Sequence, residues 1–526
     1  MPALPFTFER LLFEPNQADA DAIPVILFFP NTYEIGITSL GFQIVWATLA
    51  SRQDVAIYRY FTDINESVPK DVELMGISFS WELDYVNILS VLERLGIPLS
   101  ASDRTDDHPL IFGGGPVLTA NPEPYAEFFD VILLGDGELL LHQFVERYQT
   151  TRDQSRLTQL LSLAQEPGIY VPSLYEVQYD APAGPIASIT PIHSETPTQV
   201  QKQTYRGDRL STSTVVTEKS AWENIYMVEV VRSCPEMCRF CLASYLTLPF
   251  RVPDVQQSLI PAIERGLQVT DRIGLLGASI TQHPEFDALL SYFDRSECDH
   301  VRLSVASMRT NTVTPALAQT LSNHGTRSVT IAIESGSERL RDIVNKKLAQ
   351  EEIYQAARYA KEGGLKGLKL YGMSGIPGED PEDIEATIAL LLDLKKKVSN
   401  LKLTFGCSTF VPKAQTPFQW YGVNPESKKR LKLLQKKLAP KGIDFRPESY
   451  NWSVIQSLLA RGDRRLSQLL TLTRHYGDSV GSFKRAFKEL KGQLPPLDFY
   501  AFDDWSQDQV LPWEHLRGPL PKATLA

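Results

Sequence analysis

The sequence predicts an α/β protein in three parts: a doubly wound, Rossmann-like N-terminal module, a partial (β/α) barrel of the TIM type, and a helical C-terminal extension. Short apolar runs alternate with segments of helical periodicity twice along the chain, which indicates parallel sheets with helical crossovers. From about residue 425 onward the pattern is that of amphipathic helices. The chain has 526 residues, which is too long for a single ordinary domain.

Composition narrows the class of protein. A hydrophobic content of 43% and an aromatic content of 10% are sufficient for large cores, and five cysteines do not make a disulfide framework. The net charge of −10 argues against a protein that binds nucleic acid over its whole surface. The first residues carry Glu9, Glu14, Asp19 and Asp21 and no long apolar stretch, so we expect neither a signal peptide nor a membrane span. We therefore expect a cytoplasmic protein.

The expected division follows these composition changes. It has a polar lead-in at 1–22, the Rossmann-like module at 23–165, a connector at 166–220, the barrel at 221–424 and the helical region at 425–526. The connector is recognised by a stretch rich in Pro, Ala, Ser and Thr between Pro182 and Pro197, which is typical of irregular structure.

The N-terminal module is predicted from five apolar or alternating runs separated by helical patterns. The expected strands are Pro24–Phe29, Asp54–Tyr60, Leu74–Phe79, Pro109–Phe112 and Val131–Leu134. In a sheet of this kind ligands bind beyond the carboxyl ends of the strands. Two glycine-rich turns, Gly113–Gly115 and Gly135–Glu138, fall at those ends. They either form part of a ligand site or only make tight turns.

The barrel is predicted from a second series of strand and helix patterns. The expected strands are Tyr226–Val231, Arg272–Leu276, Val301–Val305, Ser328–Ile333, Leu368–Tyr371 and Leu401–Phe405. Six strands rather than eight indicate a partial barrel. In barrels of this type the active residues lie at the carboxyl ends of the strands.

Three of the five cysteines, Cys234, Cys238 and Cys241, lie in a short loop directly after the first expected barrel strand. Thiolates select iron–sulfur clusters, zinc or Cu(I). A structural zinc site and an ordinary ferredoxin cluster each take four ligands, whereas the next cysteine, Cys298, is distant in sequence. Three ligands on a four-iron cluster leave one iron open. The alternatives are a zinc site completed by a distant side chain and three buried structural thiols.

The spacing Cys-x3-Cys-x2-Cys, with Phe240 before the last cysteine, resembles the signature of the radical S-adenosylmethionine (SAM) superfamily. The resemblance implies that Cys234, Cys238 and Cys241 hold a [4Fe–4S] cluster whose open iron binds SAM. It also implies an enzyme that cleaves SAM reductively to methionine and a 5′-deoxyadenosyl radical, with an electron donor such as flavodoxin or ferredoxin. It brings no known substrate.

Further strand ends resemble the SAM pocket of that superfamily and imply five cofactor-binding residues. Gly277 stands where the family has Gly-Gly-Glu, but only this glycine matches, so the partner of the SAM ammonium stays open. Arg309, after Ser304, would bind the SAM carboxylate, since guanidinium pairs with carboxylate in a bidentate manner. Glu334 would accept hydrogen bonds from the ribose hydroxyls of SAM, and Gly375 belongs to the loop that would lie beside its adenine. The alternatives are a tight turn for Gly277 and a surface arginine for Arg309.

The N-terminal glycine-rich turns resemble the cobalamin-binding domain found in one large branch of the superfamily. The Asp-x-His-x-x-Gly motif that supplies a cobalt ligand in many such domains is missing, and His108 is the first histidine. The module therefore either binds cobalamin without histidine or has lost or changed the ligand. The segments Phe410–Lys413 and Thr416–Trp420 resemble an uncharacterised subgroup of these proteins, and this resemblance covers nearly the whole chain. Bound cobalamin would imply methyl transfer to an unactivated carbon.

Two further features leave alternatives open. Cys407 ends the last expected barrel strand and either takes part in chemistry or is a small buried thiol. Lysines and an arginine gather between Lys428 and Lys441, either as a solvated helix face or as an RNA-contacting surface. Three hypotheses for the function therefore remain. They are a radical SAM enzyme that acts on a small molecule, an RNA-modifying relative, and a non-catalytic iron–sulfur or zinc protein.

Overall fold

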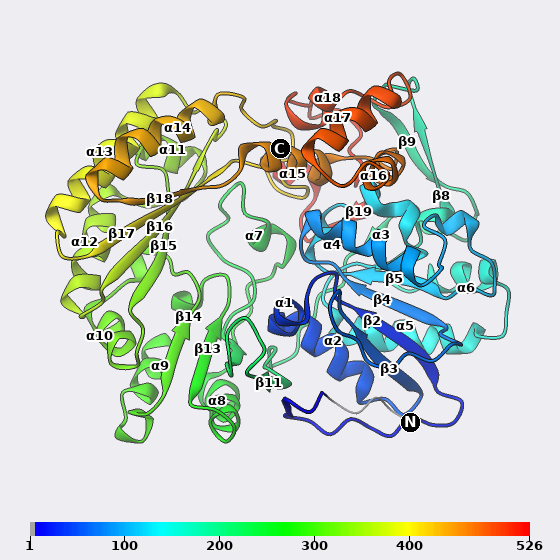
Figure 1. Cartoon of the computed structure of the whole chain (residues 1–526), viewed down its shortest axis with the longest axis horizontal. Coiled ribbons are helices and arrows are strands. Elements are labelled where there is room, and N and C mark those ends of the chain that lie inside the picture. Colours follow the sequence, from blue (N-terminus) through cyan, green and yellow to red (C-terminus); the bar gives the residue numbers. More distant parts are fainter. Residues whose placement is uncertain (1–5) are drawn as a thin grey trace.

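The computed structural model describes residues 6–526, so the first five residues of the expected lead-in lie outside it. The N-terminal module is a six-stranded sheet with helices on both sides (Figure 1). Its strands are β2 (Ile23–Phe28), β3 (Val55–Tyr60), β4 (Leu74–Ser78), β5 (Leu110–Gly114), β6 (Val131–Leu133) and β7 (Ile169–Tyr170). Its helices are α1 (Tyr33–Thr38), α2 (Leu40–Ala50), α3 (Tyr85–Arg94), α4 (Pro116–Ala120), α5 (Gly137–Thr151) and α6 (Arg156–Leu163).

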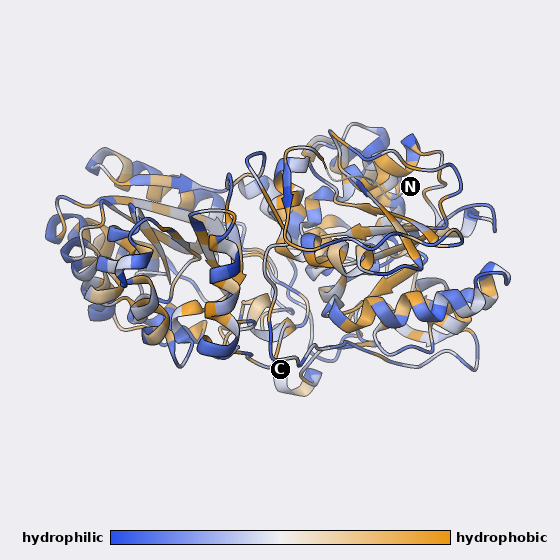
Figure 2. Ribbon diagram, turned by 90° about the horizontal axis from the view of Figure 1, so that it is seen from below, coloured by the Kyte–Doolittle hydropathy of each residue, from blue (hydrophilic) through white to orange (hydrophobic). Residues whose placement is uncertain are grey.

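The strand order is β3-β2-β4-β5-β6-β7, and all neighbours are parallel except β6 and β7. The crossover after β2 leads to β3 on one side, whereas the later crossovers add strands on the other side, so the order reverses between β2 and β4. Doubly wound sheets bind their ligands at such a reversal. Strands buried on both faces read as continuous apolar runs, which is why the sequence predicted them well. Figure 2 shows these strands as hydrophobic, with hydrophilic residues on the outer faces of the helices.

The barrel consists of two parallel sheets, β12-β13-β14 and β15-β16-β17-β18. A single bridge between Met308 and Ile331 joins them. The strands are β12 (Tyr226–Glu229), β13 (Arg272–Leu276), β14 (Arg302–Val305), β15 (Ser328–Glu334), β16 (Gly367–Ser374), β17 (Lys402–Thr409) and β18 (Asp444–Pro447). The helices outside them are α8 (Ile260–Leu267), α9 (Phe286–Phe293), α10 (Pro315–Asn323), α11 (Glu338–Ile343), α12 (Gln350–Glu362), α13 (Pro381–Lys397) and α14 (Ser427–Leu438).

The expectation of six barrel strands is wrong by one, because β18 lies within the region that was expected to be only helical. This strand has four residues, of which Phe445 alone is buried, so it carries too little pattern to be recognised. Its pairing with β17, from Thr404↔Asp444 to Cys407↔Pro447, defines it instead. The partial, open barrel itself is confirmed.

Smaller elements link the two modules. They are β1 (Glu9–Leu11) paired with β11 (Val215–Thr217), the hairpin of β8 (Tyr175–Tyr179) and β9 (Ile186–Pro191), and β10 (Val200–Gln201) paired with β19 (Leu516–Arg517). The C-terminal helices are α15 (Tyr450–Arg461), α16 (Leu466–His475), α17 (Val480–Glu489), α18 (Leu497–Ala501) and α19 (Lys522–Leu525).

The C-terminal helices share the hydrophobic core of the N-terminal module rather than that of the barrel. Leu458, Leu466 and Phe483 are buried together with Phe79 and Leu118 from the β4 and β5 side of the N-terminal sheet. In Figure 1 these helices, in orange and red, lie above the blue helices α3 and α4. The two ends of the chain therefore form one folding unit. Along residues 6–526, no helix combines the length and the apolar composition needed to cross a membrane.

A buried polar cluster fastens the C-terminal segment to this unit. Tyr170 donates to a carboxylate oxygen of Glu123 over 2.5 Å, and Arg464 donates to the same side chain. The His515 ring lies 3.8 Å from Glu123 and packs against Tyr170 and Tyr175, with ring centroids 4.9 and 5.3 Å apart. Burial lowers the pKa of His515 from 6.5 to about 4, although Glu123 opposes that shift.

His515 should make the protein less stable in mild acid. Below pH 6.5 the His515 imidazole is protonated in the unfolded chain, whereas in the folded chain it stays neutral until about pH 4. The free energy of unfolding therefore falls as the pH is lowered through that window. The slope should approach about 1.4 kcal/mol per pH unit from this group. Urea unfolding of wild type, His515→Gln and the exposed-site control His300→Gln between pH 7 and 4 measures it. The His515 variant should lose this part of the pH dependence, and an unchanged dependence would contradict the assignment.

Candidate active site

The cysteine loop follows β12 at the carboxyl end of the first barrel sheet and leads into the short helix α7 (Leu242–Leu246). Two of its non-glycine residues have left-handed backbone conformations, Ser233 with φ 72° and Met237 with φ 53°. Such conformations are uncommon and turn the chain sharply. The loop therefore curls at the strand end, while Tyr245 and Leu246 of α7 are buried in the core of the N-terminal module.

The three thiols on this loop are free and have only weak polar partners. Cys234 lies 3.9 Å from the amide oxygen of Gln282, and Cys238 lies 3.7 Å from the carbonyl of Asn345. Burial raises the pKa of Cys238 to about 12, and Lys346 opposes that shift. Burial also raises the pKa of Cys241, while the backbone N–H groups at the start of α7 favour its thiolate. Metal coordination overcomes such burial by deprotonating the thiol.

The three thiols of this loop lie near one another. In residues 6–526 there is no group of three His, Cys, Asp or Glu side chains placed to hold a single metal ion. The thiols nevertheless lie close enough for Cys234 and Cys241 to act on the pKa of Cys238.

Two ion pairs surround the cysteine loop. Lys346 contacts Glu334 over 2.8 Å, and both residues are more than nine-tenths buried. Arg309 contacts Glu236, within the loop, over 3.2 Å and donates to the backbone carbonyls of Lys346 and Lys347. Burial alone would lower the pKa of Lys346, but Glu334 and Cys238 raise it above its usual value. Lys346 and Arg309 thus place two positive charges beside the three thiols, which become anionic thiolates when they bind a metal.

The structure brings three of the five expected cofactor-binding residues to this place. Gly277 directly follows β13 and has φ 149°, and a Cβ there would lie 2.7 Å from the carbonyl oxygen of Val231, at the start of the cysteine loop. Arg309 and Glu334 are the members of the ion pairs described above. Glu334 itself has φ 62°, which turns the chain at the end of β15.

The other two expected residues lie differently. Ser304 is inside β14, one residue before its end. Gly375 has φ 85°, and a Cβ on it would meet the hydroxyl of Ser427 at 2.1 Å, so this glycine serves the packing of α14 against the end of β16. Its N–H donates to Glu379 over 2.6 Å. Cys407 is buried among the apolar side chains between β17 and the outer helices, where burial raises its pKa strongly.

Sequence reasoning missed the side chains that hold the cysteine loop from outside. Lys346 and Asn345 follow α11, and Asn345 donates to the carbonyls of Glu236 and Met237. Gln282 follows β13 and donates to Glu236 over 2.5 Å. No pattern in the sequence singles them out, because their partners are distant along the chain. Glu236 could have been suspected, since it is an acid between two candidate ligands.

Charged side chains join the cysteine loop to the carboxyl edge of the N-terminal sheet. Arg232, two residues before Cys234, contacts Glu138 over 2.7 Å and Asp136 over 3.4 Å. Arg251 contacts Asp136 over 2.6 Å. Burial opposes ionisation of Asp136, but the two guanidinium groups hold its pKa below the usual value. The second glycine-rich turn is therefore bound directly to the cysteine loop.

A cavity of about 230 Å³ opens at this same edge. Its wall combines apolar side chains, such as Leu27 and Ile77, with the glycines of both turns and with Arg232. Gly115 has φ 111°, and a Cβ there would lie 2.5 Å from the carbonyl oxygen of Phe79, so this turn requires glycine. The cavity therefore lies where the strand order reverses and also touches the base of the cysteine loop.

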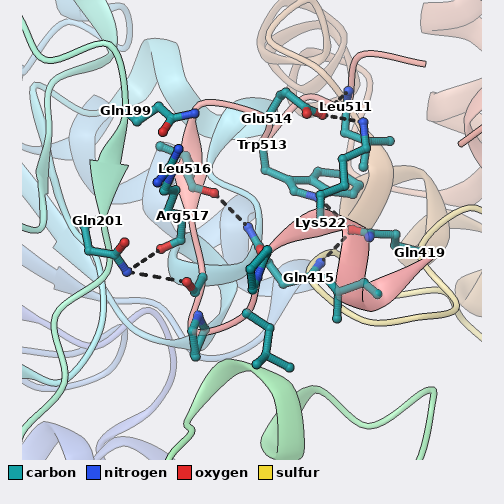
Figure 3. A pocket seen from close by; sticks show the side chains of 15 residues that line it. Gln199, Gln201, Gln415, Gln419, Leu511, Trp513, Glu514, Leu516, Arg517 and Lys522 are labelled. Atoms are coloured by element: carbon teal, nitrogen blue, oxygen red, sulfur yellow. Dashed lines mark hydrogen bonds and ion pairs between the residues drawn. The ribbon is translucent and has the colours of Figure 1, made fainter. Parts of the chain in front are cut away.

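A second cavity, of about 370 Å³, lies beneath the C-terminal segment (Figure 3). Trp513 donates to the amide oxygen of Gln419 over 2.9 Å, and Gln415 donates to the carbonyl of Leu516. Gln415 and Gln419 belong to the loop after β17, which also contacts the cysteine loop through Phe418 and Arg239. The last residues of the chain thus support that loop from behind.

Comparisons with known proteins define the class. Residues 228–391 match the profile of the radical SAM superfamily, and residues 63–172 match the profile of radical SAM proteins, N-terminal. The protein is therefore a radical SAM enzyme, and its radical SAM domain implies a [4Fe–4S] cluster and SAM as cofactors. The resemblance expected from the cysteine spacing is confirmed at this level.

Among known proteins, the chain is similar to the uncharacterized protein MJ0966 of Methanocaldococcus jannaschii, with 27% identity over 88% of this chain and 94% of that protein. It is also similar to the uncharacterized methyltransferase PH0819 of Pyrococcus horikoshii, with 23% identity over 62% of this chain and 66% of that protein. Its fold is that of the radical SAM methyltransferase TsrM from Kitasatospora setae, solved with cobalamin and a [4Fe–4S] cluster. That match has a TM-score of 0.51 and 14% identity, and covers 76% of this chain and 77% of TsrM.

Replacing Arg232 should loosen the joint between the two modules. Arg232→Met leaves Glu138 and Glu229 without their cation in a largely buried setting, so we expect a loss of about 3 kcal/mol in the free energy of unfolding. Denaturant unfolding measures this loss, and limited proteolysis of the 203–212 segment measures local opening. The control is Arg206→Met, at an exposed position nearby. Equal stability of the two variants would contradict the role of Arg232.

Proposed function

We propose that this protein is a cobalamin-assisted radical SAM methyltransferase. The observation that carries the proposal is the meeting of the cysteine loop with the ligand edge of the N-terminal sheet at Arg232. In this proposal Cys234, Cys238 and Cys241 hold the cluster, and cobalamin binds at the N-terminal edge. When bound, the cluster and SAM supply an electron and a 5′-deoxyadenosyl radical, and cobalamin supplies a methyl carrier.

The chain's own residues would orient these groups and neutralise their charge. Lys346 and Arg309 are cations beside the thiols, so they would offset the negative charge that three thiolates bring into a buried place. Glu334 would keep Lys346 charged. Gly277, Ser304, Arg309, Glu334 and Gly375 remain the proposed SAM-binding residues. Glu334 and Arg309 would have to exchange some of their present partners to bind SAM.

Cobalamin fits the N-terminal edge on three grounds. The cavity there is mainly apolar, and it would hold one end of this large molecule. Trp81 and Leu139, which follow β4 and β6, are 48% and 60% exposed, so large apolar side chains stand at the edge without cover. TsrM, which has the same fold, was solved with cobalamin bound. No histidine lines the cavity, so cobalt would take no histidine ligand from this wall.

The remaining features of the proposal follow from the class. Radical SAM proteins need a reductant, and we propose a flavodoxin or ferredoxin for that part, in the cytoplasm. We keep the expected division at residues 22, 165, 220 and 424, with one addition. The helices after residue 449 would act with the N-terminal module, because they share its core.

Anaerobic reconstitution tests the enzymatic part. With iron, sulfide, dithionite and SAM, the wild type should bind about four irons per chain and release 5′-deoxyadenosine. Cys241→Ala should lose both, whereas Cys298→Ala, at a buried thiol outside the loop, should keep both. Zinc in place of iron, or a cluster that never cleaves SAM, would leave a non-catalytic metal protein and overturn the proposal.

A pocket-filling variant tests the cobalamin part. Gly114 lines the cavity, and a Cβ there would meet only ordinary contacts, the nearest at 3.6 Å. Gly114→Val should therefore fold but bind hydroxocobalamin at least tenfold more weakly in spectroscopic titrations. Gly481→Ala, on the exposed side of α17, is the control. Equal binding by both variants, or no binding by the wild type, would contradict the site.

A further inference from the structure

The inner face of the partial barrel differs from a packed barrel core. On β16, Leu368 and Leu370 are buried against the outer helices, so the alternating residues Lys369 and Tyr371 lie on the inner face. Lys369 is exposed and Tyr371 is 48% exposed, although β16 is flanked by strands on both sides. Barrel interiors are usually filled by layers of bulky apolar side chains. This face is instead open to solvent.

Five strands place a basic side chain on this face. They are Arg272 on β13, Arg302 on β14, Lys369 on β16, Lys402 on β17 and Arg446 on β18. Each alternates with residues of the apolar core between strands and helices, such as Ile273, Leu303, Leu403 and Phe445. The register sets Arg272 directly beside Arg302, and Lys402 beside Gly367 at the start of β16. The cations therefore form a basic band with one part on each sheet. Arg272 and Arg302 stand at the start of the first sheet, and Lys402 and Lys369 occupy the first rows of the second, with Arg446 one row further, beside Gly406.

One carboxylate, Asp444, stands within this band: it lies beside Thr404 in the row of Lys369, and Arg446 and Lys402 both act to lower its pKa. Arg446 contacts Asp444 over 2.7 Å, and Arg272 donates to the carbonyl of Glu223. In the part of the chain that the structure describes, Arg302, Lys369 and Lys402 make no ion pair. Like charges on neighbouring strands repel, so the arrangement costs stability unless an anion joins it. It is all the more unusual in a chain with a net charge of −10.

The row that contains Arg446 also offers a flat aromatic surface. Tyr371 lies beside Gly406 on β17, and a Cβ on that glycine would lie 2.8 Å from the Tyr371 ring. The ring therefore lies across Gly406, in the direction of Arg446, which is the next residue in register. A substrate body could pack on this ring while its charged end reaches the cations.

We propose that the inner face binds an elongated anionic small molecule as the substrate, with its phosphate or carboxylate end at Lys369 and Lys402. This inference rests on the proposed function, because it names the substrate class of the same enzyme. Lys369 stands five residues before the end of β16, which corresponds to about 16 Å along the strand. The carbon that reacts at the carboxyl edge and the anionic group therefore lie far apart in the substrate.

Binding of two probe anions tests the proposal. Titration calorimetry of the full-length reconstituted protein with inorganic tripolyphosphate and with dodecanedioate should show binding that weakens with salt. The double variant Lys369→Gln/Lys402→Gln should weaken it at least tenfold. The control is Lys428→Gln/Lys432→Gln, on the exposed outer face of α14, which should bind as the wild type does. Binding of dodecanedioate would mark a carboxylate end, and binding of tripolyphosphate alone a phosphate end.

Three results would overturn the proposal: no binding of either probe, equal binding by the inner-face variant and the control, or tighter binding of a short single-stranded oligoribonucleotide through the α14 lysines. The last result would indicate an RNA substrate on the outer face. These outcomes are separate from failure of the proposed function, which shows as absence of 5′-deoxyadenosine from the wild type. Anion binding is measured without SAM turnover.

Discussion

The ion pairs between Arg232 and the turn Asp136–Glu138 are the contact on which the rest of the site depends. They bring the carboxyl edge of a doubly wound sheet against the carboxyl edge of a barrel. Each edge is the place where its own fold binds ligands. Because Arg232 is two residues from Cys234, any ligand at the N-terminal edge lies next to the cysteine loop. The two edges at which such folds bind ligands are thus neighbours in this protein.

The cysteine loop is held by side chains from several strand ends rather than by its own structure. Glu236 is reached by Arg309 after β14 and by Gln282 after β13, while Asn345 binds the loop backbone from beyond α11. The loop has no regular secondary structure of its own before α7. Its shape is therefore a tertiary property, and a cluster bound there would be oriented by both sheets of the barrel.

Charge is distributed unevenly over this acidic protein. Cations gather beside the thiols, at the joint between the modules and on the inner face of the barrel. The first two groups have carboxylate partners, whereas the inner-face band largely has none. Paired cations in buried places are explained by the cost of leaving a charge alone. The largely unpaired basic band is the part of the molecule where we propose that an anionic ligand supplies the missing negative charge.

The sequence by itself determined the class of protein and most of the strands. Apolar runs predict strands that are buried on both faces. The spacing of three cysteines within eight residues is sufficient to indicate the radical SAM motif. It did not reveal β18, whose four residues become a strand only because β17 offers a free edge. Nor did it reveal that the C-terminal helices join the N-terminal core, or that Lys346, Gln282 and Asn345 surround the cysteine loop. These contacts join residues that are far apart in the chain, and local patterns carry no information about which distant surfaces will meet.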